Sequence, residues 1–126
     1  MAQVRYFVSD VAASVDFYVD ALGFAVVQQF GAMAIVERDD LKVWLAGPDA
    51  SASRPMPDGA VPAPGGWNRF ALTVDDLAAT VEELRGRGAR FRNDVVKGPG
   101  GQQILLEDPA GNPIELFQPA GQPPEA

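Results

Sequence analysis

The chain has 126 residues, of which 47% are hydrophobic and 21% charged, as in an ordinary soluble globular domain. Its formal net charge of −7, with ten scattered Lys and Arg residues, argues against a nucleic-acid partner and suits a cationic small ligand. The sequence has no Cys and no His, which excludes disulfides, zinc–thiolate sites, Cys nucleophiles and His triads. No apolar run approaches the ~20 residues of a membrane span, so we expect a cytoplasmic protein that does not contact a membrane.

The first half of the chain predicts one helix and four strands. Residues 3–8 alternate as a strand does, with one apolar and one mixed face. The apolar face carries Val4, Tyr6 and Val8, and the mixed face carries Gln3, Arg5 and Phe7. Asp10 is suited to cap a helix, in which apolar residues recur at helical spacing until Gly23. Further strands are predicted over 24–30, 33–37 and 41–46, which gives the order βαβββ.

Residues 47–66 are rich in Pro, Gly, Ala and Ser, a composition typical of loops and linkers. The segment is either a plain connector between two modules or a loop that lines a site. The sequence alone leaves both interpretations open.

The pattern then repeats. A strand is predicted over 68–74, a helix from the cap Asp76 to about Gly86, and a strand over 89–96. The hairpin 103–117 closes the repeat around the turn Asp108-Pro109-Ala110-Gly111-Asn112. An offset of 66 residues aligns Val8 with Val74 and Asp10 with Asp76. We therefore expect one structural domain with modules at 1–46 and 67–118, a linker at 47–66 and a disordered tail at 119–126.

Two motifs of the sequence are distinctive. They are Val8-Ser9-Asp10 before a helix with Phe17-Tyr18 and Leu22-Gly23-Phe24, and the closing Asp108-Pro109-Ala110-Gly111-Asn112-Pro113-Ile114-Glu115-Leu116. Both motifs resemble those of the vicinal oxygen chelate superfamily, the group of glyoxalases, bleomycin-resistance proteins and extradiol dioxygenases. The resemblance implies an α+β fold in which two βαβββ modules form a curved mixed sheet around an open barrel-like cleft. It also implies a homodimer, with clefts either within one chain or between two.

Enzymes of this superfamily typically hold a divalent metal with one side chain from the first and one from the last strand of each module. The resemblance carries these positions onto Gln3, Trp44, Arg69 and Glu115. Trp offers no metal ligand, and the guanidinium of Arg has no lone pair for a cation. We therefore expect no metal and no cofactor, and an ion pair between Arg69 and Glu115 where the metal would be. Whether that pair touches a ligand or only replaces a lost site is left open.

Strand alternation predicts which side chains line the cleft. Val43 and Leu45 are predicted to face the core, so Trp44 between them faces the cleft. In the same way, Ile114 and Leu116 are predicted to face the core, so Glu115 faces the cleft. The predicted ligand-binding residues are Gln3, Arg5, Phe7, Met33, Trp44, Trp67, Arg69, Gln103, Glu115 and Phe117. Trp44 is suited to stack on a flat ligand. Trp67 is either a pocket rim or a dimer contact, and Arg5 either an anion-recognition residue or a structural one.

These residues favour a metal-independent protein of the bleomycin-resistance type, which sequesters an aromatic or cationic natural product or drug. The alternative is an enzyme of the same superfamily. It would be either a metal-free isomerase or cyclase with Glu115 as its catalytic base, or a metal-dependent lyase or dioxygenase. A third class, a protein-interaction module with a vestigial cleft, predicts that no small molecule stabilises the fold.

Overall fold

The computed structural model describes residues 2–121. The chain folds into two compact units, and each is described by itself below. Unit 1 comprises Met1–Trp67 together with Asp108–Asn112, and unit 2 comprises Asn68–Glu107 together with Pro113–Ala126. Among the described residues no helix is long and apolar enough to cross a membrane.

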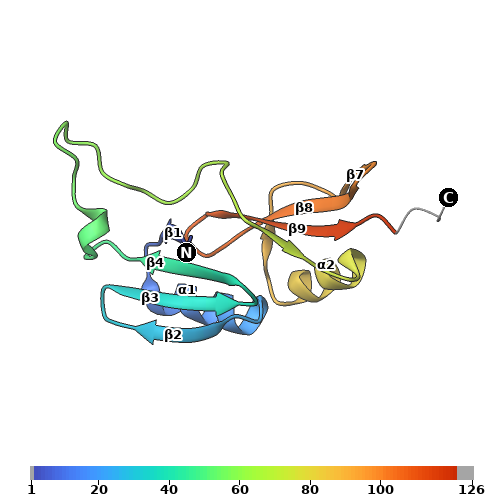
Figure 1. Ribbon diagram of the computed structural model, residues 1–126, viewed down its shortest axis with the longest axis horizontal. Helices are drawn as coiled ribbons and strands as arrows, with labels where there is room; N and C mark the ends of the chain where they lie inside the picture. The colour runs from blue at the N-terminus through green and yellow to red at the C-terminus, as the bar shows by residue number, and fades with distance from the viewer. Residues whose placement is uncertain (1, 122–126) are drawn as a thin grey trace. The chain divides into compact units, whose positions relative to one another are not determined.

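Unit 1 is one four-stranded sheet with a helical segment on one face (Figure 1). Its elements are β1 (Val4–Phe7), α1 (Val11–Asp16), a π-helix η1 (Phe17–Ala21), β2 (Ala25–Gln29), β3 (Met33–Arg38), β4 (Leu41–Ala46) and a 3-10 turn η2 (Ser51–Ser53). The strand order is β1-β4-β3-β2, with β1 parallel to β4 and the other pairs antiparallel. The predicted βαβββ order is confirmed.

The helix of unit 1 begins where the sequence predicts. The Asp10 carboxylate accepts a hydrogen bond from the Ala13 amide at 3.0 Å, which satisfies one of the free amides of the first turn. Val15 and Tyr18 are buried on the side of the helix that meets the sheet. The single predicted helix is α-helical only to Asp16 and continues as a π-helix, and Gly23 ends it with a positive φ of 73°.

Unit 2 repeats the topology. Its elements are β5 (Ala71–Thr73), α2 (Leu77–Gly86), β6 (Arg90–Phe91), β7 (Val96–Gly98), β8 (Gly101–Glu107) and β9 (Pro113–Pro119). The strand order is β5-β9-β8-β6, with β5 parallel to β9. The short strand β7 also pairs with β8, at the opposite end of β8 from β6. Asp76 caps α2 as Asp10 caps α1, since its carboxylate accepts from the Ala79 amide at 3.0 Å. The α+β class with two βαβββ modules is confirmed.

Two predicted strands are shorter than expected. The strand predicted over 68–74 begins at Ala71, because position 113 would lie opposite Arg69 in this register and proline has no amide hydrogen to donate. The strand predicted over 89–96 is divided into β6 and β7. Between them the Asn93 side chain accepts the hydrogen bond of the Leu105 amide at 2.9 Å, in place of a backbone carbonyl.

The closing strand is longer than predicted. β9 runs to Pro119, and the Ala120 amide donates to the Gly100 carbonyl at 3.0 Å. Residues 119 and 120 of the predicted tail are therefore paired with β8 and the residue before it, and residues 122–126 lie outside the described residues.

Candidate functional site

A buried carboxylate organises the turn between β8 and β9. Asp108 is fully buried, and its Oδ1 accepts from the Ala110 and Asn112 amides at 2.9 Å each. Its Oδ2 accepts from the Tyr18 hydroxyl at 3.0 Å and from the Asn112 side-chain nitrogen at 2.9 Å. Four donors thus replace the water that the carboxylate loses on burial. The sequence analysis identified the turn but missed this role, for which the only signal was an Asp and an Asn at its two ends.

Asn112 extends this network to two other segments of unit 1. Its Nδ2 donates to the Phe7 carbonyl at 2.7 Å, at the end of β1, and its Oδ1 accepts from the Gly65 amide at 2.8 Å. Gly65 lies near the end of the proline-rich segment 47–66. The Asp108 turn therefore fixes both the end of β1 and the end of that segment.

The buried Tyr18 hydroxyl should make the free energy of unfolding decrease at alkaline pH. Its pKa is raised well above the ordinary value by burial first, then by the negative charge of Asp108 and by the hydrogen bond to it. Above a pH of about 10 the unfolded chain ionises this tyrosine while the native protein does not. The stabilisation is therefore complete below pH ~10 and is lost as the pH rises toward the raised native pKa, by about 1.4 kcal/mol per pH unit.

We expect Tyr18→Phe to remove this alkaline loss. Urea unfolding of both proteins at a series of pH values gives the measurement. The difference in unfolding free energy, wild type minus variant, should stay constant up to a pH of about 9.5 and then decrease. Parallel curves throughout would mean that Tyr18 ionises equally well in the native state.

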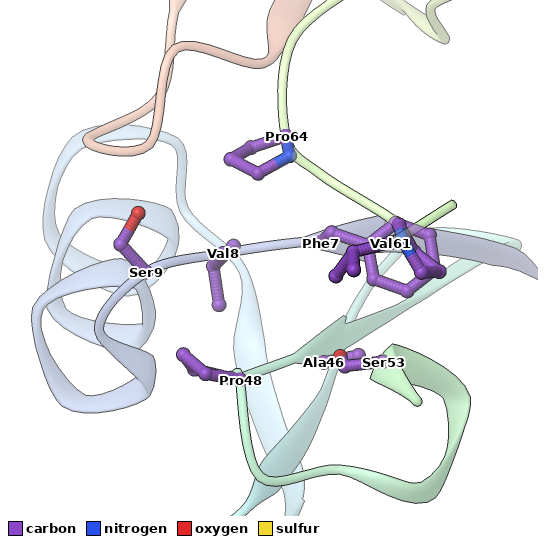
Figure 2. A pocket seen from close by; sticks show the side chains of 9 residues that line it. Phe7, Val8, Ser9, Ala46, Pro48, Ser53, Val61 and Pro64 are labelled. Atoms are coloured by element: carbon purple, nitrogen blue, oxygen red, sulfur yellow. The ribbon is translucent and has the colours of Figure 1, made fainter. Parts of the chain in front are cut away.

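Part of the segment 47–66 lines a pocket of unit 1. The segment is held at its start by the Ser53 hydroxyl, which donates to the Gly47 carbonyl at 2.7 Å, and at its end by Asn112. A pocket of about 180 Å³ lies beside it (Figure 2). Its lining is mostly apolar and consists of Phe7, Val8, Ser9, Ala46, Pro48, Ser53, Val61, Pro62 and Pro64. Figure 2 shows Phe7 at the end of β1 with Val61 and Pro64 of the segment around it.

Trp44 lies on the face of the unit 1 sheet that is opposite to the buried face. Its strand neighbours Val43 and Leu45 are fully buried, whereas Trp44 is partly exposed, as alternation predicts. In register, Trp44 is flanked by Arg5 on β1 and Ile35 on β3. The predicted facing of Trp44 is therefore confirmed.

Gln3 and Arg5 both contact the Trp44 ring. The indole Nε1 donates a hydrogen bond to the Gln3 side-chain oxygen. The Arg5 guanidinium carbon lies 4.8 Å from the ring centroid, within the range of a cation–π contact. Gln3, Val4, Arg5 and Trp44 line a second pocket of about 190 Å³.

Unit 2 contains the predicted ion pair. Arg69 donates to Glu115 Oε1 from Nε at 3.0 Å and from Nη2 at 2.8 Å. The Glu115 side chain keeps 15% of its surface exposed and that of Arg69 keeps 29%. Two donors from one guanidinium hold the carboxylate in place.

The two units use corresponding positions in corresponding ways. Arg5 lies opposite Trp44, and Ala71, 66 residues after Arg5, lies opposite Glu115. The bond between Gln3 and Trp44 in unit 1 therefore corresponds to the ion pair between Arg69 and Glu115 in unit 2. In each unit the first-strand and last-strand side chains are hydrogen-bonded to each other.

This donor set does not fit a divalent metal. An indole and a guanidinium supply no lone pair to a cation, and the Gln3 oxygen already accepts from the indole. Glu115 is paired with a fixed positive charge that would repel a metal ion. Among residues 2–121, no group of three or more Asp and Glu side chains is placed to hold one.

The remaining predicted site residues are distributed over both units. Met33 on β3 lies opposite Ala46, and Gln103 on β8 lies opposite Phe117 on β9. Trp67 is 71% exposed. The structure thus groups Gln3, Arg5 and Trp44 in unit 1 and pairs Arg69 with Glu115 in unit 2. That these groups line one cleft, and that they bind a ligand, stays a prediction.

Two consecutive βαβββ modules, each with the order first-fourth-third-second strand, define the vicinal oxygen chelate fold. Residues 1–116 match the Glyoxalase/Bleomycin resistance protein/Dioxygenase superfamily, and the chain belongs to this superfamily. No curated protein matches the sequence.

Solved structures of the same fold include enzymes and binding proteins. A lactoylglutathione lyase from Agrobacterium tumefaciens is 21% identical with a TM-score of 0.72, covering 94% of this chain and 92% of its own. An antibiotic-binding protein from Streptomyces sp. CB03234 is 26% identical with a TM-score of 0.66, covering 95% and 98%. A fosfomycin resistance protein from Listeria monocytogenes is 13% identical with a TM-score of 0.72, covering 95% and 93%.

Proposed function

We propose that this protein is a metal-independent small-molecule-binding protein that sequesters an aromatic compound without altering it. The observation that carries the proposal is the internal pairing of the positions that hold the metal in the superfamily's enzymes. Gln3 is bonded to Trp44, and Arg69 to Glu115. Within each unit the two side chains are hydrogen-bonded to each other and do not offer a cluster of metal ligands.

The binding surface of this proposal is the face of unit 1 that carries Arg5, Phe7 and Trp44. Arg5 and Phe7 are two residues apart on β1 and therefore point to the same face. One pocket of about 190 Å³ lies beside Trp44, and the loop-lined pocket of about 180 Å³ lies beside Phe7. A closed apolar cavity of ~150 Å³ is large enough for benzene, so each pocket suits a single ring or part of a larger ring system.

A role in resistance, in the cytoplasm and as a homodimer, belongs to the same proposal. The antibiotic-binding and fosfomycin resistance proteins of the same fold support the role in resistance. A catalytic role for Glu115 is less well supported, because a general base must have its carboxylate available to the substrate. Here Arg69 donates two hydrogen bonds to that carboxylate.

The test uses the fact that the chain has only two tryptophans. The Trp67→Phe variant leaves Trp44 as the single indole, and Trp44→Phe leaves Trp67. We expect 2-naphthamide, a neutral flat probe, to shift the indole N–H signal of Trp44 saturably in the first variant. In the second variant the Trp67 signal should not move. Trp44→Ala should weaken the binding about tenfold, since it removes both ring stacking and apolar contact.

Two controls accompany this titration. Affinity should be the same in excess EDTA and in excess Mn²⁺, because no metal takes part in binding. Recovery of the probe unchanged after incubation separates a binding protein from an enzyme. Binding that requires added metal, or that moves only the Trp67 signal, would contradict the proposal.

A further inference from the structure

We propose that Arg5 and Gln3 make the pocket beside Trp44 selective for planar aromatic anions, such as aromatic carboxylates. This inference rests on the proposed function and specifies the ligand class of that site. It reverses the expectation from composition, since the net charge of −7 alone suggests a cationic ligand.

Within residues 2–121, Arg5 has no carboxylate partner. It is exposed on β1, and the interaction that it makes within residues 2–121 is its contact with the Trp44 ring. Other arginines pair with a carboxylate at distances from 2.8 to 3.9 Å, namely Arg38, Arg69, Arg87 and Arg92. In so acidic a chain, a cation left unpaired at the edge of a pocket is available to an anion from solution.

The side chains of the pocket lining add a further donor. The Gln3 side-chain oxygen accepts from the indole Nε1, and the Gln3 amide NH₂ is a donor. The Trp44 side chain carries no acceptor, and its single donor is used in the bond to Gln3. The guanidinium of Arg5 and the amide NH₂ of Gln3 match an anion, whereas a cationic ligand would meet the positive charge of Arg5.

The contact with Trp44 holds Arg5 beside the pocket. Its guanidinium carbon lies 4.8 Å from the centroid of the indole ring, and the N–H donors of a guanidinium lie along the edge of its plane. A carboxylate can accept two parallel N–H bonds from that edge, and this requires the two groups to be coplanar. A ring attached to the carboxylate then lies against the pocket wall. The net negative charge of the chain should repel an anion only weakly. Most of this charge lies farther from the pocket than the Debye length of about 8 Å, so salt largely screens it.

Three probes with the same ring and different charge test the proposal: 2-naphthoate, 2-naphthamide and 2-naphthamidine. With Trp67→Phe as the background, we expect 2-naphthoate to bind about tenfold or more tightly than the amide, as a charge-assisted hydrogen bond would give, and the amidine to bind most weakly. Arg5→Gln should abolish the preference for 2-naphthoate over the amide. Arg5→Lys should keep part of the preference, because it retains the charge but not the planar fork.

Arg87→Gln is the matched control. It removes the same charge from an exposed surface pair in unit 2, and the preference for 2-naphthoate should be unchanged. If the amide and the amidine bind at Trp44 as tightly as 2-naphthoate, the anion site is wrong while the proposed function stands. If no probe binds at Trp44, the proposed function fails as well. An equal loss of all three probes in Arg5→Gln would make Arg5 a structural residue and would also overturn the inference.

Discussion

Asp108→Ala should lower the free energy of unfolding by about 3–5 kcal/mol, the range expected when one partner of a buried charged network is removed. The carboxylate is fully buried and accepts four hydrogen bonds. Without it, the Tyr18 hydroxyl and the amides of the turn lose their acceptor inside the protein. Urea unfolding at neutral pH measures the loss. Asp16→Ala, at an exposed position of α1, is the matched control and should change stability by less than about 0.5 kcal/mol.

The same substitution should loosen the wall of the loop-lined pocket. Asp108 holds the Asn112 side chain, which in turn holds the Phe7 carbonyl and the Gly65 amide. Amide hydrogen exchange should therefore become faster in the segment 61–66 of Asp108→Ala than in that of Asp16→Ala. Unchanged protection there, together with full loss of stability, would show that the turn supports the core and not the pocket.

Helix caps and strand alternation could be predicted because each depends on residues that are close together in the sequence. Asp10 and Asp76 each cap a helix with the hydrogen bond that the residue type favours, and strand alternation assigns Trp44 and Glu115 to the face opposite the core. The offset of 66 residues relates the first strands of the two parallel pairs, in which Arg5 lies opposite Trp44 and Ala71 opposite Glu115. At the positions that the resemblance carried over, Gln3 is hydrogen-bonded to Trp44 and Arg69 is paired with Glu115.

The partners of the site residues are harder to predict, because they depend on side-chain geometry between distant segments. Opposite charge indicated that Arg69 would pair with Glu115, whereas nothing in the sequence indicates that the Trp44 indole donates to Gln3. The burial of Asp108 was also missed. A five-residue turn with Pro and Gly is ordinarily exposed, and this one is buried through contacts with distant residues such as Tyr18, 90 residues away, and Phe7.

Gly101→Ala should destabilise the protein by about 3–5 kcal/mol, because it adds a steric clash to an unfavourable backbone conformation. Gly101 begins β8 with a φ of 146°. A Cβ atom there would lie 2.2 Å from the Gln118 carbonyl oxygen and 2.9 Å from the Pro119 Cα, which are backbone atoms of the paired strand β9. Neither can move aside as a flexible side chain could, so the end of the β8–β9 ladder must shift.

The neighbouring glycine provides the control. Gly100→Ala adds the same methyl group one residue earlier, where no atom lies within 4 Å and no positive φ is required. It should leave the unfolding free energy within about 0.5 kcal/mol of wild type, or raise it slightly by restricting the unfolded chain. Glu115 lies on β9, so the comparison also tests whether its ion pair with Arg69 depends on the pairing of β8 with β9. If the two variants are equally stable, the pairing of Gly101 with Pro119 is not maintained in solution and β9 ends earlier than Pro119.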